Sequence, residues 1–162
     1  MTTLVDPVPL IAALNERAIP YVIIGGFAVI ANGYVRSTED LDVLVPASAE
    51  TAAAVAEICR ELGGTDRDGA EIPAGRFTGE QHVRAHTRHG ILDIVPEGES
   101  PLSYAEIAAG AFEIDVEGQK APVAGLAHLV ALKRLGGRTR DQADLEALEE
   151  AHGELPALDS SA

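Results

Sequence analysis

The chain contains 162 residues with a mass of 16.9 kDa, which is the size of one domain built around one hydrophobic core. Its 12 Lys and Arg are outnumbered by 26 Asp and Glu, and the formal net charge of −14 disfavours an extensive surface for nucleic acid. Aromatic residues make up 4% and Trp is absent, so stacking platforms for single-stranded nucleic acid are poorly supplied.

The same composition excludes two further classes of protein. Hydrophobic residues make up 46%, which is too many for a disordered segment, yet no run reaches the roughly 18 apolar residues that a membrane span needs. The N-terminus lacks the basic region and apolar block of a signal peptide, and the single Cys59 has no partner for an internal disulfide. We expect a cytoplasmic protein without membrane contact.

The N-terminal half predicts alternating helices and strands. Asp6 and Pro7 favour a helix start, and Leu10, Ile11 and Leu14 recur at helical spacing, so the first helix is expected to run to about residue 17. The segments that follow are, in order, a buried strand at 20–26, a short helix at 27–33, a strand at 41–46 and an Ala-rich helix at 47–64.

The C-terminal half predicts two hairpins and a helical end. Residues 81–88 and 91–96 read as strands joined by a two-residue turn at His89-Gly90. The later segments are a short helix from Ser100-Pro101 to Ala109, a hairpin at 112–124 around Glu117-Gly118, a helix at 125–137 and a helix at 139–153 capped by Thr139. The polar, Gly-rich segment 64–75 reads as a mobile loop.

This order predicts an α+β fold with a small mixed sheet that carries the site at one edge, flanking helices and a C-terminal helical pair. The expected boundaries are a core at 1–124, a helical segment at 125–155 packed on the same domain, and a frayed tail at 156–162.

Two carboxylates lie close together at the start of the second strand. Asp40 and Asp42 stand two residues apart, so the two-residue period of a strand places them on the same side. Adjacent carboxylates repel each other unless a cation joins them, and hard divalent ions prefer oxygen ligands. The pair is a candidate metal site, although such a pair is more often a solvated turn.

Asp93 interrupts an otherwise apolar strand, where an unpaired charge costs several kcal/mol. One explanation is a salt bridge to an arginine such as Arg36 or Arg84. The other is a third metal ligand beside the strand of Asp40 and Asp42, which completes a carboxylate triad for one or two ions.

Gly25 and Gly26 lack side chains and let backbone amides approach phosphate oxygens. Arg36 is expected either to neutralise a phosphate or to hold Asp40 in place. The hydroxyls of Ser37 and Thr38 are expected to bind phosphate or to cap the loop.

The segment GGFAVIANGYVRSTEDLDVLV resembles the signature of the DNA polymerase β-like nucleotidyltransferases, in particular a small bacterial branch with minimal nucleotidyltransferases and AbiEii-like toxins. The resemblance implies the nucleotidyltransferase fold. It also implies that Gly25 and Gly26 contact nucleotide phosphates, that Asp40 and Asp42 bind Mg²⁺, and that Asp93 is the third carboxylate, which activates the acceptor hydroxyl.

The C-terminal segment LVALKRLGGRTRDQADLEAL resembles the same branch more loosely. By this resemblance Lys133 reaches nucleotide phosphates, and Asp141 or Asp144 supports the site. The alternative is a solvated helix face with ordinary charge pairs, such as Arg140 with Asp144.

Four cationic side chains alternate along the strand at 81–88. His82, Arg84, His86 and Arg88 share one face, and a turn at His89-Gly90 places His86 opposite Asp93. His86 is therefore a secondary candidate for the site; a solvated cationic face explains the pattern equally well.

The first hypothesis is a Mg²⁺-dependent enzyme, with Mn²⁺ as an alternative ion, that moves a nucleoside monophosphate from an NTP such as ATP to an acceptor hydroxyl or phosphate. The resemblance leaves a tRNA end, a protein side chain or a small molecule as the acceptor, and it includes a toxin with an antitoxin partner. The alternatives are a non-catalytic nucleotide-binding or protein-interaction module on the same fold, and a structural protein that oligomerises through the helix at 48–62.

Overall fold

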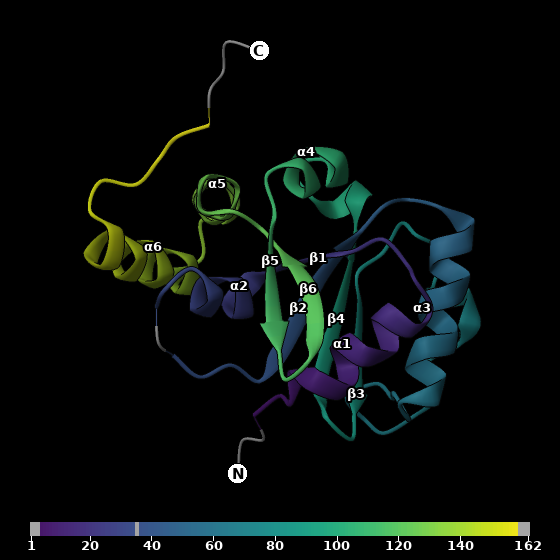
Figure 1. Cartoon of the computed structure of the whole chain (residues 1–162). Coiled ribbons are helices and arrows are strands. Elements are labelled where there is room, and N and C mark those ends of the chain that lie inside the picture. Colours follow the sequence, from purple (N-terminus) through teal and green to yellow (C-terminus); the bar gives the residue numbers. More distant parts are fainter. Residues whose placement is uncertain (1–3, 35, 159–162) are drawn as a thin grey trace.

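The computed structural model describes residues 4–34 and 36–158 (Figure 1). Its helices are α1 (Pro7–Glu16), α2 (Gly25–Ala31), α3 (Ala49–Glu61), α4 (Tyr104–Ala109), α5 (Leu126–Gly136) and α6 (Thr139–His152), with short 3-10 helices at Ala74–Arg76 and Glu97–Glu99. Its strands are β1 (Val22–Ile24), β2 (Asp40–Val45), β3 (Val83–Thr87), β4 (Gly90–Pro96), β5 (Phe112–Val116) and β6 (Gln119–Val123).

The strands form one mixed sheet in the order β3-β4-β2-β1-β6-β5. The pairs β3–β4, β1–β2 and β5–β6 are antiparallel, whereas β2–β4 and β1–β6 are parallel. This confirms the predicted α+β class with a small mixed sheet. The acidic strands β2 and β4 lie inside the sheet, and β3 forms the edge beside them.

Alternation along the strands separates a packed face from the face that carries the acids. Leu41 and Val43 are fully buried, and Asp40 and Asp42 alternate with them along β2. Helices α1 and α3 lie beside the sheet on the side away from α5 and α6, with the strands between the two groups (Figure 1). The carboxylates share a cavity with residues of α5 and α6.

Helix starts in the N-terminal half follow the predicted chemistry. The Asp6 carboxylate accepts a hydrogen bond from the Val8 amide, and Ser48 caps α3 by accepting from the Thr51 amide. The expected helix after the first strand begins earlier, at Gly25, because no loop separates it from β1. The helix expected from Ser100 begins instead at Tyr104, because Ser103 caps it.

The predicted turn between β3 and β4 is wrong by one residue. The two loop residues are Arg88 and His89, and Gly90 already pairs with Thr87. The Thr87 side chain causes this: its hydroxyl accepts from the His89 amide at 3.0 Å and donates to the Gly90 carbonyl at 2.7 Å. The register of the whole hairpin therefore differs from the predicted one.

Three further predictions concern the β5–β6 hairpin, the start of α6 and the C-terminal tail. The hairpin around Glu117 and Gly118 is confirmed, and both residues have positive φ as a tight turn requires. Thr139 does not cap α6; it is the first helical residue, and Asp141 accepts the hydrogen bond from the Arg138 amide. Part of the tail predicted at 156–162 lies outside the described residues.

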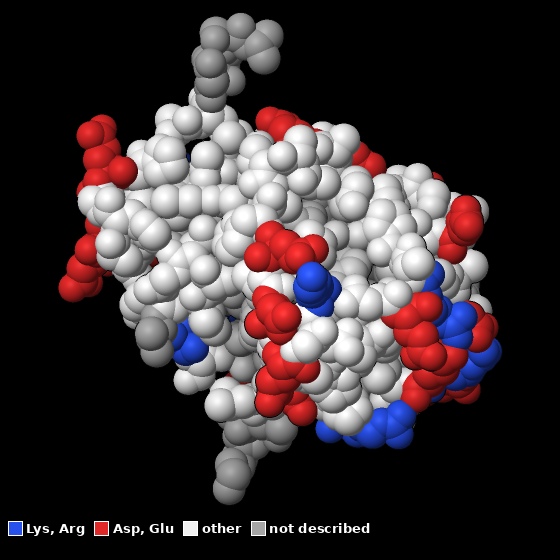
Figure 2. Space-filling view, in the orientation of Figure 1, with Lys and Arg blue, Asp and Glu red and all other residues white. Residues whose placement is uncertain are grey.

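Acidic side chains spread over the β5–β6 hairpin and the outer part of α6 in Figure 2, in keeping with the net charge of −14. None of the helices formed by residues 4–34 and 36–158 combines the length and the hydropathy that a bilayer crossing requires.

Candidate active site

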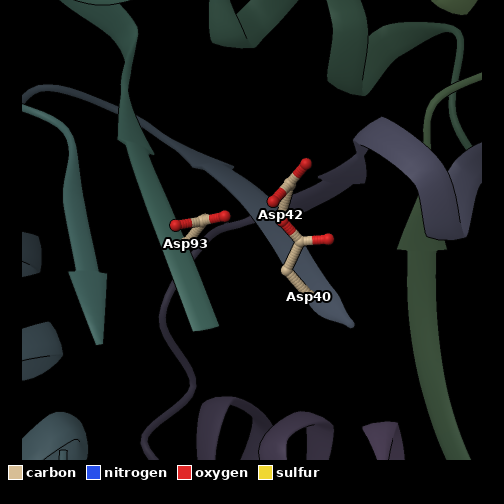
Figure 3. A group of neighbouring side chains, drawn as sticks. All are labelled: Asp40, Asp42 and Asp93. Atoms are coloured by element: carbon tan, nitrogen blue, oxygen red, sulfur yellow. The ribbon is translucent and has the colours of Figure 1, made fainter. Parts of the chain in front are cut away.

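Three carboxylates converge on one face of the sheet. Asp40 and Asp42 extend from β2, and Asp93 extends from the neighbouring parallel strand β4, directly opposite Asp42 (Figure 3). One oxygen from each of the three side chains lies within 4.8 Å of the others. The side chain of Asp93 is only 4% exposed and that of Asp40 is 13% exposed. The sequence prediction that the three aspartates meet is confirmed, and the spacing suits a divalent cation.

Asp42 is the carboxylate that most needs a partner. Among the described residues nothing donates a hydrogen bond to its buried Oδ1 atom. Burial, and next the neighbouring carboxylates of Asp93 and Asp40, raise the pKa of Asp42 to about 8. Burial also raises the pKa of Asp40, and Asp93 adds to this effect. A bound cation would satisfy the unpartnered oxygen and offset the repulsion, so the donor set fits Mg²⁺ or Mn²⁺.

Gly25 lets the chain approach this carboxylate. It follows β1 with a φ of +71°, and a Cβ atom built on it would overlap Oδ2 of Asp42. Two independent requirements therefore select glycine at this position: the left-handed backbone and the close approach of the carboxylate.

Gly25→Ala is expected to lower the free energy of unfolding by more than about 2 kcal/mol, because backbone strain adds to the overlap with Asp42. The matched control is Gly63→Ala, since Gly63 has a φ of +69° but open space around its Cβ position. The control should lose only about 1 kcal/mol in urea denaturation. Equal losses in the two variants would show that the contact with Asp42 contributes nothing.

Asp93 is held by Arg84 of β3 and by His82, the residue just before that strand. Arg84 donates from Nε to Oδ1 and from Nη2 to Oδ2, both at 2.9 Å, and Nε2 of His82 lies 3.1 Å from Oδ1. Nη2 of Arg84 also donates to Asp40 at 3.2 Å. Burial alone would raise the pKa of Asp93, but the hydrogen bonds from His82 and Arg84 hold it well below its usual range. The hydrogen bond to Asp93 raises the pKa of His82.

The predicted salt bridge between Asp93 and Arg84 is therefore present, and the predicted pairing with His86 is wrong. Because the turn comprises Arg88 and His89, Arg84 lies opposite Asp93 and His86 lies opposite Ile91. His86 shares the face of Arg84 but is two residues farther along the strand. The sequence pattern thus predicted the correct face of β3 but the wrong register between β3 and β4.

Arg84→Gln is expected to tighten the binding of Mn²⁺ to the nucleotide-free protein about five-fold, because removing a unit charge near a solvated site changes the energy by on the order of 1 kcal/mol. Isothermal titration with MnCl₂ measures the change. Arg88→Gln, at the end of the same hairpin, is the matched control and should leave the affinity unchanged, since Arg88 contacts the Glu61 carbonyl instead. Weaker binding in Arg84→Gln would show that Arg84 does not compete with the cation.

The loop before β2 holds Asp40 and braces the glycines. The hydroxyl of Thr38 donates to Oδ1 of Asp40 at 3.0 Å, so it positions the carboxylate. Arg36 does not hold Asp40, contrary to one of its two predicted roles. Its Nη1 donates to Asp144 at 2.6 Å, and Nη2 lies where a Cβ atom of Gly26 would be. Ser37 is exposed at the surface.

A buried ion network joins α5 and α6 behind the site. Nζ of Lys133 lies 3.3 Å from Oδ1 of Asp141 and 3.0 Å from Oδ2 of Asp144, and all three residues are at most 5% exposed. Asp144 does not pair with Arg140, and the helix face is not solvated. The interpretation of Asp141 and Asp144 as an ordinary surface face is thus wrong, because they neutralise Lys133 and Arg36 inside the protein.

The three acids, together with Lys133 and Asp141 of the network, line one cavity of about 350 Å³. Several residues that line this cavity were not predicted from the sequence. They come from segments far apart in the chain, and no local sequence pattern marks them. These additional lining residues are Ile24, Val95, Glu99, Ser100, Pro101, Leu129, Leu132, Arg138 and Arg140. A cavity with carboxylates at its base and Arg138 and Arg140 at its rim suits a molecule that carries phosphates.

No protein-family model matches the sequence, and no curated protein matches it either. Solved structures do share its fold. The lincosamide antibiotic adenylyltransferase LnuA, with lincomycin bound, superposes with a TM-score of 0.63 at 14% identity over 92% of this chain and 99% of that chain. ANT(2″)-Ia in complex with adenylyl-2″-tobramycin gives a TM-score of 0.56 at 18% identity over 90% and 87% of the two chains.

An antigenic nucleotidyltransferase-like protein from Paracoccidioides brasiliensis is similar over 87% of this chain and 72% of that chain, with a TM-score of 0.58 and 17% identity. The predicted arrangement of sheet and helices is thus found in other solved proteins.

Proposed function

We propose that the chain, which has the fold of the nucleotidyltransferases, is a Mg²⁺-dependent enzyme that moves a nucleoside monophosphate from an NTP to a hydroxyl or phosphate group of an acceptor and releases pyrophosphate. The observation that carries the proposal is the convergence of Asp40, Asp42 and Asp93 around the unpartnered oxygen of Asp42. Such a set of oxygens suits one or two Mg²⁺ ions.

Each element of the cavity has a role in this proposal. Asp40 and Asp42 would hold the cation, which when bound supplies charge neutralisation to the phosphates and to the leaving group. Gly25 and Gly26 line the cavity, where their backbone amides would contact phosphate oxygens. Asp93 would accept the proton of the acceptor hydroxyl once Arg84 has moved away, because the hydrogen bonds from Arg84 and His82 hold its pKa well below the range of a general base.

The connection between α5 and α6 and the first turn of α6 would supply positive charge to the triphosphate. Arg138 and Arg140 line the cavity, and Lys133 lies deeper, neutralised by two aspartates. Lys133 therefore supports the cavity wall and presents its ammonium group from within. That Lys133 reaches the nucleotide phosphates stays a prediction.

The acceptor proposed first is a small molecule. The two similar adenylyltransferase structures contain lincomycin and adenylyl-tobramycin, both small molecules, so a small molecule is the first acceptor class to test. A tRNA end or a protein side chain, and with it a toxin role and an antitoxin partner, rests on the sequence resemblance alone.

The test is thermal unfolding with each NTP, with and without Mg²⁺. A ligand that binds only the folded protein raises the midpoint, so the wild type should show a Mg²⁺-dependent shift that Asp40→Asn/Asp42→Asn loses. The matched control is Glu146→Gln/Glu150→Gln, which changes the charge equally on the exposed side of α6 and should keep the shift.

One observation favours the second candidate, a non-catalytic nucleotide-binding module. Arg84 already bridges Asp93 and Asp40, as an internal cation would in a site that never holds a metal. In that case nucleotides should stabilise the wild type equally with and without Mg²⁺. An equal shift of the unfolding midpoint with and without Mg²⁺ would therefore contradict the enzyme proposal and support the non-catalytic module.

A further inference from the structure

A second groove runs along the outer edge of β3, next to the carboxylates. It has a volume of about 420 Å³, and its lining includes the arginines Arg67, Arg76 and Arg84 and the histidines His82 and His86. His82 and Arg84 also line the cavity that contains Asp93, so the groove and the candidate active site share a wall. A molecule lying in the groove reaches Asp93 past these two side chains.

The loop that carries Arg67 is fixed to the sheet. The amide of Thr65 donates to the His86 carbonyl at 3.0 Å, and the amide of His86 donates to the Thr65 carbonyl at 2.8 Å. Thr65 also forms a bridge with Glu71. The wall of the groove is therefore built by backbone hydrogen bonds to β3.

The groove concentrates free positive charge on a strongly acidic protein. Arg67 and Arg76 are exposed and form no ion pair within the described part of the chain, while the net charge is −14. The groove also contains one acid, Asp66, but its Oδ1 atom accepts hydrogen bonds from the amides of Asp68 and Ala70 at 2.8 and 3.0 Å. Neither Arg67 nor Arg76 pairs with Asp66, so both guanidinium groups are left for an anion from outside.

The strand order sets the direction from which the acceptor arrives. Asp42 contacts Gly25 at the end of β1, and Asp93 on β4 contacts β3. In an in-line displacement the attacking oxygen and the leaving pyrophosphate lie on opposite sides of the phosphorus. With the triphosphate at the glycines, the attacking oxygen comes from the side of β3, where the groove lies.

We infer that the acceptor of this enzyme is a phosphate-bearing compound, held in the groove along β3 by Arg67 and Arg76 with its hydroxyl directed at Asp93. This inference rests on the proposed function. Guanidinium groups bind phosphate through paired, charge-assisted hydrogen bonds. The apolar side chains of Ile72, Pro73 and Val83 in the same groove fit the carbon skeleton of a sugar or the face of a base.

Isothermal titration tests the inference with the nucleotide site already filled by Mg²⁺ and the non-hydrolysable analogue of the NTP that gives the largest thermal shift. Ribose 5-phosphate and a six-nucleotide RNA are the probes, because they separate a small phosphate ester from a nucleic-acid end, and ribose is the phosphate-free control. We expect at least one phosphate-bearing probe to bind the wild type about ten-fold or more tightly than it binds Arg67→Gln/Arg76→Gln, and ribose not to bind.

The matched control is Arg60→Gln/Arg134→Gln, which removes the same charge from α3 and α5 outside the groove and should bind the probe as the wild type does. Equal affinity for the wild type and Arg67→Gln/Arg76→Gln, or no binding of either phosphate-bearing probe, overturns the inference. The Mg²⁺-dependent nucleotide shift of Arg67→Gln/Arg76→Gln should persist. A missing nucleotide shift in the wild type would instead overturn the proposed function.

Discussion

Replacing Asp144 with Asn is expected to lower the free energy of unfolding by about 2–4 kcal/mol, because it breaks a buried ion pair and leaves the opposite charge behind. Oδ1 of Asp144 accepts from Arg36 at 2.6 Å, and its Oδ2 lies 3.0 Å from Nζ of Lys133. Lys133 keeps Asp141 in the variant, whereas Arg36, whose side chain is only 17% exposed, loses its carboxylate.

Loss of the ion pair between Asp144 and Arg36 should also affect the candidate active site. Arg36 lies directly against Gly26, so a guanidinium that leaves Asp144 no longer braces the glycine turn. Urea denaturation of wild type and variant measures the stability, with Glu146→Gln on the exposed side of the same helix as the control, expected within about 0.5 kcal/mol of the wild type. A variant as stable as this control would mean that the network contributes little to the fold.

Asp42→Asn is expected to reduce turnover by roughly a thousand-fold while making the metal-free protein more stable. The substitution keeps the shape of the side chain and removes the titratable group from one of the three converging acids. The turnover falls because the cation loses a ligand, and the stability rises because burial and the neighbouring carboxylates disfavour the ionised form of Asp42.

The stability gain depends on pH with a defined sign. The pKa of Asp42 is about 8 in the folded protein and about 3.9 in an unfolded chain. Between these values the unfolded chain has released the proton that the folded protein still binds, so the wild type loses stability as pH rises from about 4 to about 8. Asn does not titrate, so the advantage of the variant grows over this range and stays constant above it.

Thermal unfolding of wild type and Asp42→Asn from pH 4 to 9, without divalent ions, measures this difference. Saturating Mg²⁺ should reverse the order, since only the wild type keeps the complete carboxylate set. Asp115→Asn, at the exposed end of β5, removes one carboxylate elsewhere and should follow the wild type at every pH. A constant difference across the pH range would contradict the raised pKa of Asp42.

The sequence was sufficient to predict what depends on short-range patterns. The two-residue spacing of Asp40 and Asp42 and the single charge of Asp93 within an apolar strand predicted that the three acids meet, and they do. The helix start at Asp6 and the turn at Glu117-Gly118 depend equally on local chemistry, namely a capping carboxylate and positive φ angles.

Other features depend on contacts that no local pattern encodes. The register of β3 and β4 was determined by the hydroxyl of Thr87, which closes the turn around Arg88 and His89, so Arg84 rather than His86 lies opposite Asp93. The burial of Asp144 depends on Arg36, more than a hundred residues earlier in the chain. Hydrophobic periodicity and secondary-structure propensity do not identify such partners, because tertiary packing brings them together.

The most direct test of the central claim is a crystal structure of the wild type with Mn²⁺ and the non-hydrolysable NTP analogue that gives the largest thermal shift. The account predicts anomalous density for manganese between Asp40 and Asp42 within reach of Asp93, with the triphosphate at Gly25 and Gly26 and with Arg84 moved away from Asp93. Nucleotide bound in the cavity without manganese, with Arg84 still on Asp93, would contradict the carboxylates as a metal site and leave a binding module.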